Sequence, residues 1–354
     1  MTEPRTIALD VMGGDFGPSV TVPGAGIAAE RHPHLTFLLV GDEAKIAPEL
    51  ARVPALAGRA TIKHTDQVIA MDAKPSQALR RGRNSSMGQA LEAVREGQAD
   101  FAVSAGNTGA LMALSMLILR PLEGIDRPAL VAQWPTVHRP SIVLDVGANI
   151  GATARELCDF ALMGAAMARA LFDIERPTVG LLNVGVEEIK GVEEVKRAHG
   201  WLKEANLDID YKGFVEGDQI GQGIVDVVVV EGFAGNIALK TAEGTAKQIG
   251  TYLKEAMTSS LASKLGAVLA KGGFMQLKHR MDPRRVNGGT FLGLNGISIK
   301  SHGGSDAFGF ASAIEVGYQM ARSGIVARLD ADLKAFHGKL DAIANEAAVQ
   351  AVKS

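Results

Sequence analysis

The feature that most limits the fold of this sequence is a repeated unit: a short apolar run, a glycine-rich loop, and then a helical pattern. The apolar runs predict β-strands at residues 6–11, 36–40, 101–104, 130–133, 142–146, 178–182, 225–230 and 297–300. Helical periodicity appears at 86–96, 108–119, 156–172, 188–205, 236–256 and 306–322. Most strands are continuously apolar, which is typical of strands covered by helices on both faces. The pattern predicts an α/β protein with three α/β/α layers around a mainly parallel sheet.

Six of the predicted strands end in loops that combine glycine with Asn, Ser, Thr or Asp. These loops occupy residues 12–15, 105–109, 146–149, 183–185, 231–236 and 301–306. In an open parallel sheet, such loops share the edge at which ligands bind. Glycine lets backbone N–H groups approach a ligand closely, and the helix N-termini behind the loops favour anions. One such loop alone is more typical of a plain tight turn, but six together predict a single sheet edge that binds an anionic ligand.

The composition argues against several classes of function. A formal charge of −2 disfavours nucleic-acid binding, because a phosphate backbone requires a basic surface. Cys158 is the sole cysteine, so no intramolecular disulfide is possible, and its apolar helical surroundings are typical of a core thiol. The eight histidines show no metal-ligand spacing, and no P-loop or serine-nucleophile motif is present. We therefore predict no metal site and no cofactor.

We expect neither a signal peptide nor a membrane-spanning segment. Residues 1–9 contain Glu3, Pro4 and Arg5 and no apolar stretch suited to a signal peptide. The longest apolar run, 109–119, is shorter than the ~20 residues that cross a bilayer. We expect a cytoplasmic protein that at most associates peripherally with a membrane.

A relaxed dinucleotide-binding pattern occurs at Gly24, Gly26 and Ala29, with Asp42 near the position of a ribose-binding acid. However, these glycines fall inside a predicted helix rather than at a strand-to-helix turn. A nicotinamide-dependent dehydrogenase is therefore kept only as an alternative function.

A set of short segments carries a more specific signal. They are IALDVMGGD (7–15), MDAKPS (71–76), SSM (85–87), VSAGNTGALM (103–112), GIDRPA (124–129), LDVGAN (144–149), GLLNVG (180–185), GFAGN (232–236), LGLNG (292–296) and KSHG followed by SD (300–306). In order and spacing they resemble the bacterial phosphate acyltransferase family, the acyl-carrier-protein:phosphate acyltransferases. The chain departs from the family pattern at residues 150–155 and at Asn287, so no role is transferred to those positions.

The resemblance implies a fold similar to phosphotransacetylases and isocitrate-type dehydrogenases, and assembly as a homodimer. It also implies a reversible reaction that moves a fatty acyl group from an acyl-carrier-protein thioester to inorganic phosphate. The product, acyl phosphate, would feed phospholipid synthesis. On this interpretation, residues 1–354 form a single α/β catalytic domain.

The loop residues suit this chemistry, because attack of phosphate on a thioester needs an anion cradle and aligned substrates but no protein nucleophile. As phosphate ligands we predict the backbone of Gly13 and Gly14 together with Ser104, Asn107 and Thr108.

The catalytic residues are predicted from the last loop and from one other strand end. Lys300 and His302 are the expected cations, one holding phosphate and the other assisting the departing thiolate. Asp145 and Asp306 are expected to orient them. The alternative for each aspartate is an N-cap or a turn, and for His302 a structural role.

Two surface features suggest partners. Arg80, Arg81 and Arg83 form a basic cluster that suits an acidic acyl carrier protein, or is a plain solvated charge run. Residues 251–285 contain seven basic and two acidic residues, a local charge of +5, and an apolar stripe at helical spacing. We predict a basic amphipathic helical hairpin whose apolar tip contacts anionic lipid, with GGFM (272–275) breaking the helix. The membrane-contact residues are Leu265, Val268, Leu269, Phe274 and Met275.

That hairpin has a competing interpretation as a dimer interface or as packed core helices. For the whole chain, a non-catalytic protein that binds phosphate or acyl chains and a short-chain phosphotransacetylase stay open beside the dehydrogenase.

Overall fold

The computed structural model describes residues 5–280 and 282–353. Its strands are β1 (Arg5–Asp10), β2 (Leu35–Gly41), β3 (Ala60–His64), β4 (Phe101–Ser104), β5 (Ala129–Trp134), β6 (Ser141–Leu144), β7 (Thr178–Leu182), β8 (Asp210–Val215), β9 (Val227–Val229), β10 (Gly289–Leu292) and β11 (Ile297–Lys300). Its α-helices are α1 (Pro18–Arg31), α2 (Glu43–Leu50), α3 (Pro75–Arg81), α4 (Ser86–Arg95), α5 (Thr108–Ile118), α6 (Ala154–Phe172), α7 (Glu193–Glu204), α8 (Gly217–Ile220), α9 (Gly232–Thr258), α10 (Leu261–Leu269), α11 (Lys271–Arg280), α12 (Ala307–Ser323) and α13 (Ile325–Lys353).

These strands form one sheet in the order β3-β2-β1-β4-β11-β10-β5-β6-β9-β7-β8. The block from β3 to β11 is parallel, and so is the block from β6 to β8. Between the two blocks, β10 is antiparallel to both β11 and β5, and β5 is antiparallel to β6. The predicted mainly parallel sheet is confirmed.

Helices cover both faces of the sheet, which explains why its strands are apolar throughout. In β1, Ile7 and Leu9 belong to a core shared with α1, α6 and α12, whereas Ala8 belongs to a second core shared with α4 and α5. A third core joins β6 and β9 to α8 and α9. The three-layer α/β/α architecture is therefore confirmed.

The prediction that all six glycine loops share one sheet edge is wrong. Three antiparallel pairings separate the two parallel blocks, so the blocks run in opposite directions. The loops after β1, β4 and β11 lie at one edge, and the loops after β6, β7 and β9 lie at the other. The antiparallel strands β10 and β5, which lie between the two blocks, are the physical cause of this division.

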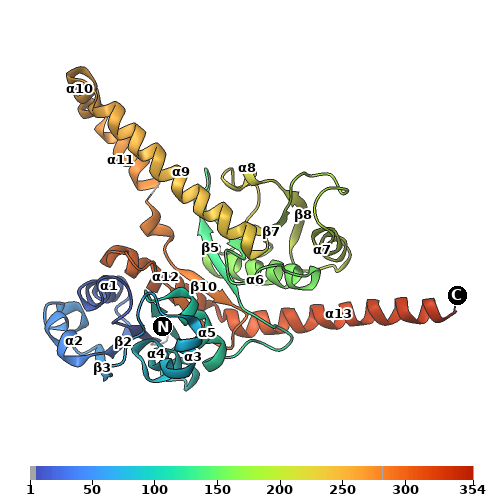
Figure 1. Ribbon diagram of the computed structural model, residues 1–354, viewed down its shortest axis with the longest axis horizontal. Helices are drawn as coiled ribbons and strands as arrows, with labels where there is room; N and C mark the ends of the chain where they lie inside the picture. Colours follow the sequence, from blue (N-terminus) through green and yellow to red (C-terminus); the bar gives the residue numbers. More distant parts are fainter. Residues whose placement is uncertain (1–4, 281, 354) are drawn as a thin grey trace.

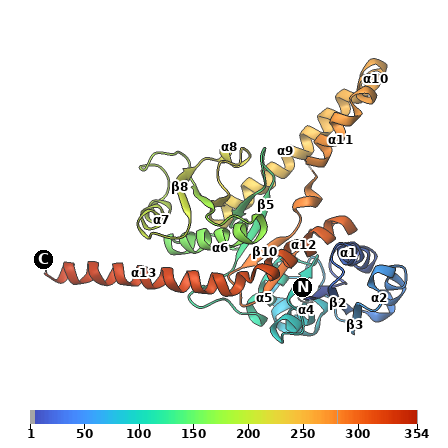
Figure 2. The ribbon, with the colours of Figure 1, turned by 180° about the vertical axis from the view of Figure 1, so that it is seen from behind.

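Two segments project from the body of the molecule. Helices α9, α10 and α11 form an arm that extends to one side, and α13 extends in a different direction (Figures 1 and 2). Along the described part of the chain, no helix combines the length and apolarity needed to cross a membrane.

The arm differs in detail from the predicted hairpin. Gly272 and Gly273 lie inside α11 instead of breaking the helix. The helical chain is interrupted at two places before these glycines. At the first, the Ser260 hydroxyl accepts a hydrogen bond from the Ser263 N–H and caps α10; at the second, α10 ends and Ala270 separates it from α11. Glycine inside a helix costs only about 1 kcal/mol relative to alanine, so it does not by itself end one.

The sequence pattern did not reveal β3, β8 or β10, because these strands are short or carry exposed polar residues. The helix expected from residue 188 begins only at Glu193. Gly191 has a φ of 90°, which no right-handed helix adopts, so the chain from 188 to 192 is a loop.

Close packing of α6 on the sheet yields a test. A Cβ added at Gly164 in α6 would lie 2.4 Å from Val227 Cγ1 and 2.8 Å from Leu144 Cδ2. Gly164→Ala should lower the free energy of unfolding by about 1–3 kcal/mol, measured by urea denaturation. The control is Gly200→Ala in α7, where the added methyl meets nothing within 4 Å. That change should leave stability unaltered or raise it by up to about 1 kcal/mol; equal losses in both variants would contradict the packing argument.

Candidate active site

The ends of three neighbouring strands align at one edge of the sheet. Asp10, Ser104 and Lys300 are the last residues of β1, β4 and β11, and the strand register pairs Asp10 with Ser104 and Ser104 with Lys300. The loops that follow remain in contact, because Ser301 N donates to Ser104 O at 2.9 Å and Asp15 N donates to Gly303 O at 3.0 Å. The structure thus brings together the 10–15, 104–108 and 300–306 loops.

Glycine is required where these loops touch. A Cβ at Gly13 would lie 2.6 Å from Asp10 Oδ2 and 2.7 Å from Gly106 N. Gly14 has a φ of 87°, and its Cβ would lie 2.9 Å from the Ala105 side chain. The two glycines predicted to cradle phosphate therefore also allow the first loop to pack against the second.

Asp10, which the sequence analysis did not single out, is the centre of the contact. It is 1% exposed, and the Ser104 hydroxyl donates to its Oδ2 at 2.6 Å. The Ser104 oxygen also accepts from Gly106 N at 3.0 Å. Burial raises the pKa of Asp10, while the Ser104 hydrogen bond opposes that shift. Ser104 is buried, and its hydroxyl both donates a hydrogen bond and accepts one. It therefore holds the loops together rather than facing a ligand.

Lys300 lies beside this pair. Its ammonium donates to the carbonyl oxygens of Ala105, at 3.3 Å, and Ser301. An ammonium has three N–H bonds, so one is left for a ligand. Burial lowers the pKa of Lys300 to about 8, although the Asp10 and Asp15 carboxylates act in the opposite direction. At neutral pH the residue is a partly buried cation at the meeting point of the three loops.

His302 is exposed two residues further along the chain. Gly304 N donates to its Nδ1 at 3.2 Å, so in the neutral ring Nε2 carries the proton. The backbone N–H of His302 donates to Asn287 Oδ1 at 3.0 Å. The amide nitrogen of Asn287 in turn donates to Ser301 Oγ, Ser305 Oγ and Gly309 O. Asn287, to which no role was transferred, therefore fixes the shape of the 301–305 loop.

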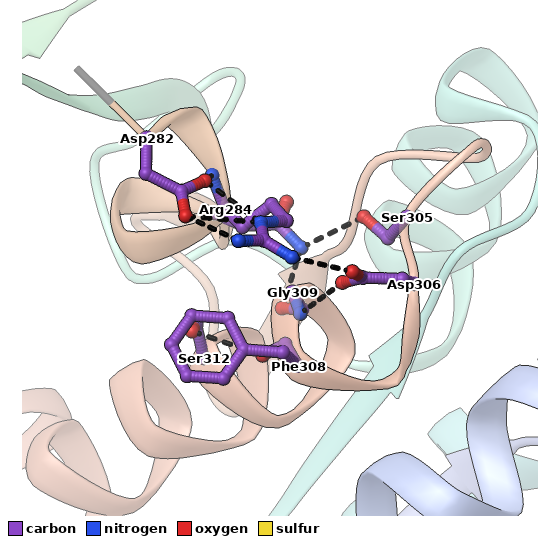
Figure 3. A network of polar contacts seen from close by, with 8 residues as sticks. Asp282, Arg284, Ser305, Asp306, Phe308, Gly309 and Ser312 are labelled. Carbon is purple, nitrogen blue, oxygen red and sulfur yellow. Dashed lines mark hydrogen bonds and ion pairs between the residues drawn. The ribbon is translucent and has the colours of Figure 1, made fainter. Parts of the chain in front are cut away.

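Asp306 does not orient Lys300 or His302. Its Oδ1 accepts from Gly309 N at 2.9 Å and caps α12, and its Oδ2 accepts from Arg284 Nη1 at 2.7 Å (Figure 3). The Gly309 N–H and the Arg284 guanidinium hold the pKa of Asp306 below its usual range. Arg284 also binds Asp282, so Figure 3 shows one guanidinium between two carboxylates. Asp306 is thus an N-cap, which was the alternative to its predicted catalytic role.

Asp145 lies elsewhere. It follows β6, which runs opposite to β11, so the topology puts it at the other sheet edge from Lys300. Its carboxylate accepts hydrogen bonds from the backbone N–H groups of Leu130, Gly147, Ala148 and Asn149. Burial raises the pKa of Asp145 despite these bonds. The residue is the anchor of its own turn, as the turn alternative proposed.

Asn107 caps α5 and Thr108 is its first residue, at the same sheet edge as Lys300. The Asn107 side chain is fully engaged, because its Nδ2 donates to Met71 O and Ala73 O, at 2.6 and 3.2 Å, and its Oδ1 caps α5 through Ala110 N. It has no amide N–H left for phosphate. Thr108, the first helical residue, is exposed.

Of the residues predicted to contact a carrier protein or a membrane, most are exposed, and a few are paired or half-buried within the protein. Arg80 and Arg81 are exposed in the last turn of α3, whereas Arg83 forms an ion pair with Glu92 at 2.5 Å. In the arm, the side chains of Leu265, Val268, Leu269 and Met275 are 63%, 68%, 81% and 57% exposed, and Phe274 is half-buried. The side chains of Lys278 and Arg280 lie outside the described residues.

The contacts of Asn107 predict that its substitution acts on stability. Asn107→Ala removes the α5 cap and the tether to residues 71–73, so it should lower the free energy of unfolding by about 0.5–2 kcal/mol, measured by chemical denaturation. Asn107→Asp keeps the capping oxygen and should lose less. An unchanged stability with a weakened affinity for phosphate would instead make Asn107 a ligand.

Comparison with known proteins identifies the family of the chain. The profile of a family described as "Fatty acid synthesis protein" matches residues 5–328. The chain is 61% identical to a phosphate acyltransferase from Sinorhizobium fredii over 334 residues, 94% of this chain and 96% of that protein. A phosphate acyltransferase from Agrobacterium fabrum is also 61% identical, over 94% of this chain and 95% of that one. A phosphotransacetylase from Streptococcus pyogenes shares the fold, with a TM-score of 0.58 at 17% identity over 91% of this chain and 94% of that chain. The resemblance found in the sequence is confirmed: the chain belongs to the bacterial phosphate acyltransferase family.

Proposed function

We propose that this enzyme transfers a fatty acyl group from an acyl-carrier-protein thioester to inorganic phosphate, and that the acyl phosphate is used in phospholipid synthesis. The observation that carries the proposal is the Lys300 ammonium, which has one N–H bond to spare where three glycine loops meet. The N-termini of α5 and α12 begin in these loops, and helix N-termini attract anions. Phosphate is the substrate that fits this combination.

The reaction needs little covalent help from the protein. A phosphate oxygen attacks the thioester carbonyl carbon, a C–O bond forms, and the C–S bond breaks. Lys300 and the backbone of Gly13 and Gly14 hold the attacking phosphate. The sulfur leaves as a thiolate, for which a pKa of about 8.5 means that modest proton donation suffices. His302 Nε2–H is the donor that we assign to this step. The whole chain acts as one catalytic unit, since one sheet runs through both of its parallel blocks.

The decisive assay is phosphate-dependent release of free thiol from acyl-carrier protein. Turnover at limiting phosphate should fall as the pH rises through about 8, because Lys300 loses its proton there. Lys300→Arg should move that fall to higher pH, and Lys300→Met should lower turnover by about 10²–10³ and abolish the fall. A fall near pH 8 that persists in both variants would assign it to another group. Absence of phosphate-dependent thiol release in the unmodified enzyme would overturn the function itself.

We also infer that the arm binds anionic membrane surfaces reversibly and that two copies of the chain associate. The exposed apolar residues of α10, in a segment with a local charge of +5, support lipid contact. Along α9, Ile237, Ile249 and Tyr252 are 49%, 52% and 59% exposed, which supports a surface for a second copy.

Charge placed on α10 tests the membrane proposal. The double change Leu265→Asp and Leu269→Asp should abolish co-sedimentation with phosphatidylglycerol vesicles and leave thiol release intact, because it removes the apolar contact far from the loops. Val137→Asp with Val184→Asp is the matched control, since these side chains are also exposed, at 71% and 80%, but lie outside the arm. Continued sedimentation of the double variant would exclude α10 as the anchor. A change in its oligomeric state would assign α10 to an interface between copies.

A further inference from the structure

An arginine cluster lies next to the candidate active site. The guanidinium carbons of Arg31, Arg284 and Arg285 are 5.5, 5.3 and 5.7 Å from the centre of the Phe308 ring. These three arginines come from α1 and from a short 3₁₀ helix, Pro283–Val286, and the ring comes from α12. The cluster has no local signature in the sequence, because Arg31 lies more than 250 residues before Arg284, Arg285 and Phe308.

The three arginines are not equivalent. Arg284 is held between Asp282 and Asp306, so its charge is neutralised within the protein (Figure 3). Arg31 and Arg285 are exposed, and neither forms an ion pair among the described residues. Contact with the aromatic ring limits the motion of their long side chains. The result is a pair of ordered guanidinium groups without an ion-pair partner among the described residues, in a group of three arginines and two aspartates whose net charge is +1.

The cluster is tied to the loop that carries Lys300 and His302. Phe308 lies two residues after Asp306, at the start of α12, and Arg284 binds Asp306 directly. Asn287, one residue beyond the 3₁₀ helix, receives the His302 N–H and binds Ser301 and Ser305. A large substrate that rests on Arg31 and Arg285 is therefore adjacent to the loop at which its thioester must react.

We propose that Arg31 and Arg285, held around Phe308, form the docking surface for the acidic carrier protein that delivers the acyl group. This inference rests on the proposed function. An acidic protein is the occupant because the surface offers unpaired guanidinium groups, which bind carboxylates well and steer an acidic partner toward the site. We favour this surface over the predicted cluster at Arg80, Arg81 and Arg83, because Arg83 is paired with Glu92, and Arg80 and Arg81 stack on no aromatic ring among the described residues.

The test compares two thioesters in a pair of charge-reversed variants. The first variant is Arg31→Glu with Arg285→Glu, and the matched control is Arg80→Glu with Arg81→Glu, which makes the same change in net charge. Thiol release is measured with acyl-carrier protein and with acyl-pantetheine, which is uncharged and lacks the carrier protein. In parallel, fluorescence anisotropy measures binding of labelled acyl-carrier protein without any turnover.

The first variant should raise the KM for acyl-carrier protein by about tenfold at low salt, and the difference should shrink as salt is added. Its kcat/KM with acyl-pantetheine should stay within about twofold of the unmodified enzyme, and the control should bind the carrier normally. An unchanged carrier KM, or equal losses with both thioesters, would overturn the docking surface. If the unmodified enzyme shows no phosphate-dependent turnover, the proposed function fails; loss of carrier binding in the first variant alone would still support the docking surface.

Discussion

The site depends on one buried row of polar residues at the ends of three parallel strands. Asp10, Ser104 and Lys300 are in register, and the Ser104 hydroxyl joins the Asp10 carboxylate to the second loop. A buried carboxylate needs hydrogen bonds and a nearby cation to offset its desolvation. This row supplies one hydrogen bond, from the Ser104 hydroxyl, and the positive charge of Lys300. The offset is partial, because Asp10 Oδ1 has no hydrogen-bond partner among the described residues and burial still raises the pKa of Asp10.

The rest of the site is arranged around this row. Gly13 and Gly14 let the first loop pass close to Asp10 and Ala105, which no larger residue would allow. Asn287 and Asp306 shape the third loop from the opposite side, through hydrogen bonds to its backbone and hydroxyl groups. Several residues that look like ligands in the sequence are thus supports, and Lys300 and His302 retain the free donors.

Division of the sheet into two opposed parallel blocks has a functional consequence. It separates Asp145 and the β6, β7 and β9 loops from Lys300, although all six loops share the same composition. The first edge is rich in polar loops with spare donors. At the second edge, Ile150, Val184 and Ile189 are 80%, 80% and 81% exposed, so this edge presents large apolar side chains to solvent.

The α/β class, the main strands, the family and the glycine loops can all be predicted from the amino-acid sequence, because apolar periodicity and glycine placement are local properties of the chain. Which of these loops meet depends on how the strands pair in the folded protein. The contacts that matter join segments that are distant in the sequence. They are the antiparallel pairing of β10 with β5, the two hydrogen bonds from the Asn107 amide to residues 71–73, and the Arg284–Asp306 ion pair. No local pattern encodes such contacts, since an Asn or Asp after a strand looks the same whether it caps a helix, binds a distant loop or faces a ligand.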